Sequence, residues 1–132
     1  MKLLTVGALM SFTAAASHAA AAMTGEPHGY VPTTGAGSWT PAIATLLIAT
    51  LFTTSGLYAL AASGRIAPMP LMEPVIHGIT AIYLIRGLFV IPQLLGYNLF
   101  ASEYDVSAAN LWLSAGILAA GLIHLAGIQP RR

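Results

Sequence analysis

The chain has 132 residues, of which 57% are hydrophobic and only 7% are charged, whereas soluble domains carry about 25% charged residues. A soluble chain this short would leave many apolar residues in contact with water, so the composition indicates a protein of the lipid bilayer. The absence of cysteine excludes disulfides and thiolate metal sites, and a formal net charge of +1 without an extended basic cluster argues against nucleic acid as a partner.

Four apolar windows are long enough, or nearly so, to cross a membrane as helices. A crossing takes about 20 mostly apolar residues, because the hydrocarbon core is about 30 Å thick and a helix rises about 1.5 Å per residue. The segments between the windows are rich in Gly, Pro, Ser and Asn, which is typical of loops. The sequence therefore predicts an all-α fold, a transmembrane four-helix bundle forming one membrane domain over residues 1–132, with spans at about 3–23, 41–62, 72–95 and 106–128.

The first span has a second interpretation, which is a cleaved secretory signal. Lys2 precedes an apolar stretch and an alanine-rich end with Ser-His-Ala before Ala20, and this order is typical of signal peptides. Cleavage would leave a bundle of three helices in the same orientation. Both interpretations are compatible with the sequence, and the mass of the intact protein distinguishes them.

The basic residues fall on one side of the membrane if the chain crosses it four times. Lys2, Arg65, Arg131 and Arg132 lie at the amino terminus, in the second loop and at the carboxyl terminus. Because cytoplasmic segments are enriched in Lys and Arg, we expect a protein of the bacterial inner membrane with both termini in the cytoplasm. The expected partners are the lipid bilayer and either another membrane protein or a second copy of the chain.

Two sets of small or hydroxylated residues are candidates for contacts between helices, which in lipid depend on close packing and hydrogen bonds. The hydroxyls of the second span can donate to carbonyls of their own helix or to a neighbouring helix. Small residues four apart in the fourth span form a stripe on which another helix can pack. The residues are Thr50, Thr53, Thr54 and Ser55 in the second span, and Ala115, Gly116, Ala119, Ala120 and Gly121 in the fourth.

Ionisable residues inside the spans are candidate binding residues, because placing them in lipid is costly. Glu73 and His77 lie four apart on one face of the third span, and His124 lies at a similar distance from the cytoplasmic end of the fourth. The two histidines can together ligate a haem or a metal, with Glu73 orienting His77. They can instead relay protons or respond to pH, or make structural hydrogen bonds. No third nitrogen or thiolate ligand lies at this depth, so we assign no cofactor and name no metal.

Arg86 is a further candidate binding residue, and it stays charged in proteins. No other span contains a carboxylate to pair with it. The acceptors available are the hydroxyls of the second span, main-chain carbonyls near Pro92, the carboxylates of Glu103 or Asp105, and a lipid phosphate reached by the long side chain. Arg86 would accordingly hold helices together or bind an anionic solute or lipid headgroup.

Catalytic motifs are absent from the sequence, which contains no paired intramembrane carboxylates, nucleophile elbow, phosphate-binding glycine loop or H-E-x-x-H. We therefore expect no enzyme. The leading interpretation is a structural, accessory or assembly subunit that acts through its helix faces. The alternatives are an electron carrier that binds haem or metal through His77 and His124, and a small proton-coupled carrier that uses Glu73, His77 and Arg86.

Four stretches of the chain, GSWTPAI, GLYALAASGRIAPMPLM, YLIRGLFVIPQLL and SAGILAAGLIHLAG, resemble a group of small four-span bacterial integral membrane proteins. The shared pattern is Gly-Leu-Tyr-Ala-Leu at the end of the second span and Tyr-Leu-x-Arg-Gly in the third. It covers most of the chain from Gly37 onward and implies that the first span is retained, but it brings no activity with it. AASG and MPLM depart mildly from the pattern. Its positions here are Tyr58, Arg65, Pro70, Tyr83, Arg86, Gly87 and His124.

Overall fold

The structure is a computed structural model that describes residues 2–24, 39–97 and 108–129. Its helices are α1 (Lys2–Thr24), α2 (Trp39–Ala62), α3 (Met72–Leu88), α4 (Val90–Leu94) and α5 (Ala108–Ile128), and the described residues contain no strand. Four segments are long and apolar enough to cross a membrane, and the third of them combines α3 with α4. The prediction of an all-α bundle with four spanning segments is confirmed.

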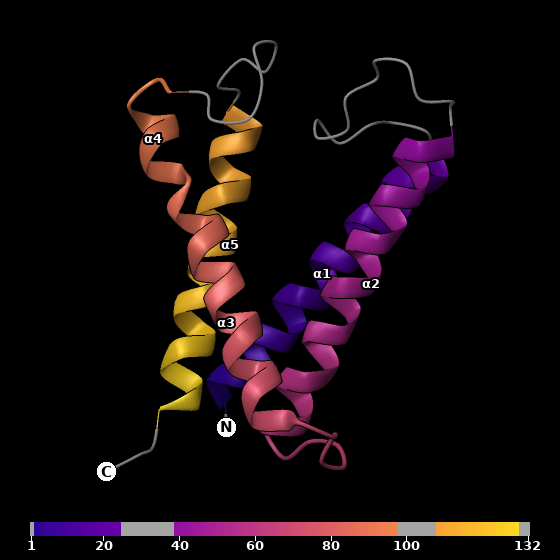
Figure 1. Cartoon of the computed structure of the whole chain (residues 1–132), viewed down its shortest axis with the longest axis vertical. Helices are drawn as coiled ribbons and strands as arrows, with labels where there is room; N and C mark the ends of the chain where they lie inside the picture. The colour runs from indigo at the N-terminus through magenta and orange to yellow at the C-terminus, as the bar shows by residue number, and fades with distance from the viewer. Residues whose placement is uncertain (1, 25–38, 98–107, 130–132) are drawn as a thin grey trace.

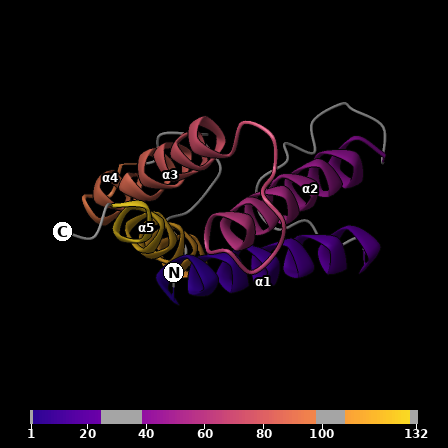
Figure 2. The same cartoon turned by 90° about the horizontal axis from the view of Figure 1, so that it is seen from below.

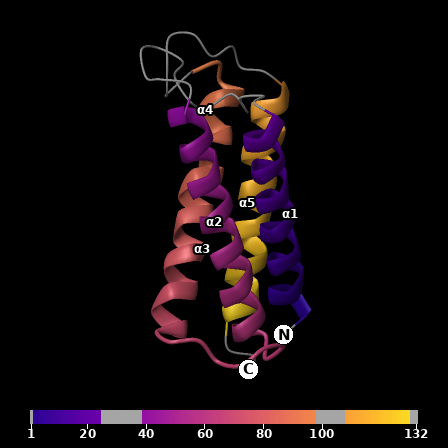
Figure 3. The ribbon, with the colours of Figure 1, turned by 90° about the vertical axis from the view of Figure 1, so that its right-hand side faces the viewer.

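The four long helices form a ring in which each helix packs against its neighbours in the chain. α1 contacts α2 and α5, and α3 contacts the same two helices from the other side. Consecutive long helices run in opposite directions, and the α1–α2 pair diverges from the α3–α5 pair toward the end of the bundle where α4 lies (Figure 1). The two pairs are also distinct when the bundle is seen from below (Figure 2), whereas from the side α1 and α2 lie in front of α5 and α3 (Figure 3).

A glycine ends α2 because the chain there turns into a left-handed backbone conformation. Gly64 has a φ of 74°, which residues with a Cβ adopt only at a cost. The N–H of Gly64 donates to the carbonyl of Ala61 at 2.9 Å, and that of Arg65 donates to Leu60 at 3.0 Å. This pair of bonds is a Schellman cap. It places Arg65 in the connection to α3, at the same end of the bundle as the start of α1 (Figure 1).

The third span is broken into two helices. α3 ends at Leu88 and α4 begins at Val90. Pro92 has no N–H to donate to the carbonyl of Leu88, and its ring crowds that carbonyl. The segment predicted at 72–95 is therefore two helices separated by Phe89, and not one continuous helix.

Glycines set the spacing between α3 and α5. A Cβ on Gly87 would overlap the main chain of Leu118, and a Cβ on Gly121 would lie 2.9 Å from the main-chain nitrogen of Leu84. Neither position has room for a larger residue. Because helices in lipid associate through close packing, these two contacts determine how near α3 and α5 come to each other.

The hydroxyls and small residues expected at helix contacts take different roles. The four α2 hydroxyls named above, those of Thr50, Thr53, Thr54 and Ser55, each donate to the carbonyl four residues earlier in their own helix, at 2.8 to 2.9 Å, which is one of the two expected alternatives. The small-residue stripe of α5 is divided, because Ala120 and Gly121 are buried whereas Gly116 and Ala119 are exposed. Only one end of the stripe is therefore a contact between helices.

We expect Gly87→Ala to destabilise the bundle by pushing α3 away from α5. The added Cβ overlaps the main chain of Leu118, and overpacking of this kind costs about 1–3 kcal/mol. Gly78→Ala is the matched control on the same helix, because no described atom lies within 4 Å of a Cβ there. Unfolding in an SDS titration should have a lower midpoint for Gly87→Ala alone. Equal midpoints for the two variants would show that Gly87 does not set the spacing.

Candidate functional site

Polar side chains from three helices meet in the interior of the bundle. The buried residues of α3 recur every three or four positions and so form one face; they are Ile76, Ile79, Thr80, Tyr83 and Gly87. Ser11 from α1 and Ser114 and His124 from α5 are also buried. Burying a polar group costs free energy unless it is hydrogen-bonded, so the partners of these side chains indicate what each of them does.

Tyr83 joins α3 to α1 at the middle of the third span. Its hydroxyl lies 2.9 Å from Oγ of Ser11, and Ser11 donates to the main-chain carbonyl of Gly7 at 3.0 Å. A serine hydroxyl has one proton, and here that proton goes to Gly7. The hydroxyl of Tyr83 is therefore the donor to Ser11, and the bond connects two helices that lie diagonally across the ring.

The ring of Tyr83 also contacts aromatic side chains of the other two long helices. Its centroid lies 5.9 Å from that of Phe52 on α2 and 5.3 Å from that of His124 on α5. The pair with His124 is edge-to-face, with an angle of 86° between the ring planes, and aromatic pairs favour this geometry. One side chain thus contacts all three of the other long helices.

His124 is packed against the main chain of α1. Its Nδ1–H donates to the carbonyl of Ala120 at 2.8 Å, which leaves the lone pair on Nε2, and Nε2 has no hydrogen-bond partner among the described residues. A Cβ on Gly7 would lie 2.6 Å from Cε1 of His124 and 3.1 Å from Nε2. Glycine at position 7 therefore provides the space that the imidazole ring fills, and a haem or metal at Nε2 would require α1 to move away.

Glu73 and His77 lie on the outer surface of α3. Both are exposed, and Nδ1 of His77 lies 2.7 Å from the main-chain oxygen of Glu73. The partner of His77 is thus a carbonyl rather than the carboxylate expected to orient it. Among the described residues, no three His, Cys, Asp or Glu side chains come close enough together to hold a metal.

The structure does not bring His77 and His124 together. The contacts of Gly87 with Leu118 and of Gly121 with Leu84 set an antiparallel register, in which His124 is level with position 81 of α3. His77 is one turn away, roughly 6 Å at 1.5 Å per residue, and it is exposed whereas His124 is fully buried. The expected similar depth is therefore accurate only to about one turn, because distances counted from helix ends ignore the offset between helices.

Arg86 is held against α5 within the span. Its Nη1 donates to Oγ of Ser114 at 3.1 Å, and Ser114 is fully buried. The guanidinium carbon also lies 5.7 Å from the centre of the Phe89 ring, within the range of a cation–π contact. Arg86 therefore links the outer part of α3 to α5 through its hydrogen bond to Ser114, while its ring contact stays within the third span, because Phe89 directly follows α3.

Ser114 was not among the acceptors expected for Arg86. The hydroxyls of α2 that were expected donate to their own helix, while Glu103 and Asp105 lie outside the described residues. The signal in the sequence is that Ser114 stands seven positions before Gly121, two turns away on the same face of the helix. Extending the predicted contact face of the fourth span two turns before Gly121 would have identified Ser114.

Comparison with models of protein families, with curated proteins and with solved structures finds no match to this chain. The resemblance to small four-span bacterial membrane proteins accordingly stays a prediction. The functional argument depends on the geometry of the described residues.

We expect Gly7→Ala and His124→Ala to be coupled in a double-mutant cycle. Gly7→Ala alone should destabilise the protein, because its Cβ overlaps the imidazole ring. In the His124→Ala background the same change should cost little, because the ring is gone. A coupling free energy of about 0.5–3 kcal/mol is typical of residues in contact, and SDS unfolding of the four proteins measures it. Additive effects would contradict the packing of His124 on α1.

Ser114→Ala should lower the stability of the bundle, because it removes a buried acceptor of the Arg86 guanidinium. A hydrogen bond to a charged group contributes about 1.5–3 kcal/mol. Ser17→Ala is the control, since Ser17 is exposed and donates to a carbonyl of its own helix. Thermal unfolding in detergent should separate the two variants. If both variants have the same midpoint, the hydrogen bond from Arg86 to Ser114 does not stabilise the bundle.

Proposed function

We propose that this chain is a multi-pass protein of a bacterial inner membrane that acts as a structural, accessory or assembly subunit through its outward-facing helix surfaces. The observation that carries the proposal is how little of each span the bundle buries. Only 22–28% of the most apolar 18-residue window of each span lies inside. The remainder is half-buried or exposed and mostly apolar, and its exposed part can contact lipid or the helices of another protein.

The outward surfaces of α2 and α3 are the strongest candidates for contact with a partner. Leu47 and Leu51 on α2 are exposed, as are Ile82 and Ile85 on α3. These are branched aliphatic side chains that pack closely against another helix without adding a polar group to lipid. A partner on either surface would leave the interior contacts of Tyr83 unchanged.

Charged and aromatic residues support the proposed orientation. Lys2 and Arg65 are both exposed at the end of the bundle where α1 begins, and the positive-inside rule places that end in the cytoplasm. Tyr97 and Trp112 are exposed toward the opposite end, where aromatic side chains favour the membrane interface. Both termini are then cytoplasmic.

The contact with a partner is tested by placing the photo-crosslinking residue p-benzoylphenylalanine at Leu51, Ile85 or Trp112, one position on each of three helices, all of them exposed. We expect one surface to yield a crosslinked protein of defined mass, either a second copy or another membrane protein, while the other positions react with lipid. The same residue at Arg65, outside the spans, is the control for random collision.

The identity of a captured protein is established by mass spectrometry and by the reciprocal crosslink from the partner. A product that forms equally from Arg65 and from the span positions would be collisional. Absence of any protein product, together with migration as a lone monomer in mild detergent and in nanodiscs, would contradict the proposed function.

A further inference from the structure

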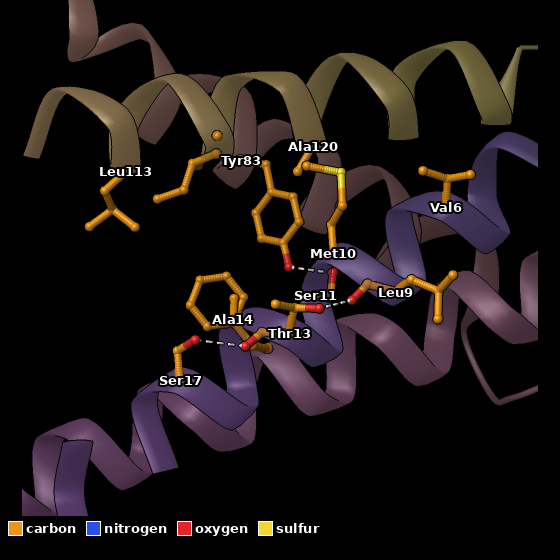
Figure 4. A pocket seen from close by; sticks show the side chains of 13 residues that line it. Val6, Leu9, Met10, Ser11, Thr13, Ala14, Ser17, Tyr83, Leu113 and Ala120 are labelled. Atoms are coloured by element: carbon orange, nitrogen blue, oxygen red, sulfur yellow. Dashed lines mark hydrogen bonds between the residues drawn. The ribbon is translucent and has the colours of Figure 1, made fainter. Parts of the chain in front are cut away.

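A cavity of about 390 Å³ lies where the two helix pairs diverge. α1 and α5 form its sides, and Phe52 of α2 and Tyr83 of α3 contribute to its wall (Figure 4). The volume falls in the range of roughly 300–1,000 Å³ typical of small-molecule sites. A transmembrane helix, roughly 10 Å wide and 30 Å long, fills on the order of 2,000 Å³. The cavity therefore matches a small molecule and is too small for a helix of a partner protein.

The cavity opens sideways toward the surrounding lipid. Leu9 of α1 and Leu113 of α5 line it and are 61% and 40% exposed. Gly116 also lines the cavity, and no described atom lies within 4 Å of a Cβ built there. Most of the remaining lining is apolar. A molecule dissolved in the bilayer can thus enter from the side without passing through water.

Every hydroxyl among the described residues that line this cavity gives its proton to the protein. Ser11, Thr13 and Ser17 each donate to the carbonyl four residues earlier in α1, at 3.0 Å. Tyr83 donates to Ser11, as the single proton of Ser11 requires. The oxygens keep lone pairs, but no hydroxyl proton is left to point into the cavity. The cavity can accept hydrogen bonds and has no hydroxyl with which to donate one.

We infer that this cavity binds an apolar molecule that carries a hydroxyl donor, an alcohol or phenol with a hydrocarbon body, and that the Tyr83 oxygen accepts its hydrogen bond. Tyr83 and Ser11 are only 5% and 2% exposed, so water does not compete strongly there. A hydroxyl that leaves water without finding a partner loses free energy. The Tyr83 oxygen is an acceptor for the hydroxyl of such a ligand. An ether of similar shape has no proton to donate to it.

A requirement for a hydrogen-bond donor distinguishes the proposed alcohol or phenol from a lipid acyl chain, which would fill the same apolar space without any polar contact. The same requirement distinguishes the proposed ligand from a ketone or ester, whose oxygen would face the lone pairs of the protein's hydroxyl oxygens. The inference goes beyond the proposed contact with a partner protein, because that contact involves outward surfaces and the cavity lies between the helix pairs.

The test compares 2-naphthol with 2-methoxynaphthalene, which share a ring system and an oxygen, while a methyl group replaces the hydroxyl proton in the ether. Both are titrated by fluorescence against the full-length protein in nanodiscs. One hydrogen bond is worth about a fivefold difference in dissociation constant, so we expect 2-naphthol to bind about five times more tightly. Gly116→Leu fills the open space of the cavity and should abolish saturable binding of both probes. Gly78→Leu, at an equally open position on α3 that does not line the cavity, should leave binding intact.

Tyr83→Phe then tests the acceptor while keeping the ring. We expect the affinity for 2-naphthol to fall to that of the ether and the affinity for the ether to stay the same. Because no described atom lies within 4 Å of a Cβ built at Gly116, its variant tests the site even if Tyr83→Phe unfolds the bundle. Circular dichroism and gel filtration verify the fold of each variant.

Three results would overturn the inference. Equal affinities of the two probes for the unaltered protein would mean that the cavity is an unselective apolar space. Binding that persists in Gly116→Leu would place the probes elsewhere on the protein or in the lipid. Failure of both probes to bind, or a crosslink from p-benzoylphenylalanine at Gly116 to a second copy of the chain, would show that the cavity is not a site for small hydroxylated molecules.

Discussion

The hydrogen bond from Tyr83 to Ser11 connects two helices that are not neighbours in the ring, and the arrangement of the interior depends on it. In lipid the exclusion of water supplies no force between helices, so packing and interhelical hydrogen bonds must hold them. The Tyr83 ring adds contacts with Phe52 and His124. The position of this one side chain therefore constrains α1, α2 and α5 together, and it also determines where the cavity presents an acceptor.

The shape of the bundle follows from where close approach is possible. At the end where α1 begins, Gly7 accommodates the ring of His124 and Gly127 lies against Leu4, so α1 and α5 meet. Farther along α5, nothing described lies within 4 Å of a Cβ on Gly116, and the helix pairs diverge (Figure 1). Contact at one end and divergence at the other produce a cavity that is open toward lipid. The same geometry leaves the outer surfaces of α2 and α3 available for a partner.

The candidate site was foreseen in part. Arg86 and His124 were singled out as candidates from the sequence, and the structure places both in contacts between helices. Ser114 was missed as the partner of Arg86, and the joint ligand site of His77 and His124, one of three alternatives, assumed a similar depth where the structure has an offset of about one turn. Both differences concern the relation between helices. A single helix shows which residues share its face, but not which residue of a neighbour lies opposite.

The sequence by itself determined the fold class and the four spans, because bilayer thickness sets their length and unpaired main-chain groups are too costly in lipid for anything but helices here. The break at Phe89 was not predicted, although its cause, Pro92, acts locally on the helix. Only the tertiary structure decided that Tyr83, Ser11 and His124 meet and that a cavity with acceptor oxygens lies beside them. The register and rotation of packed helices depend on individual contacts such as that of Gly87 with Leu118, and a shift of one residue turns a side chain by about 100° around its helix.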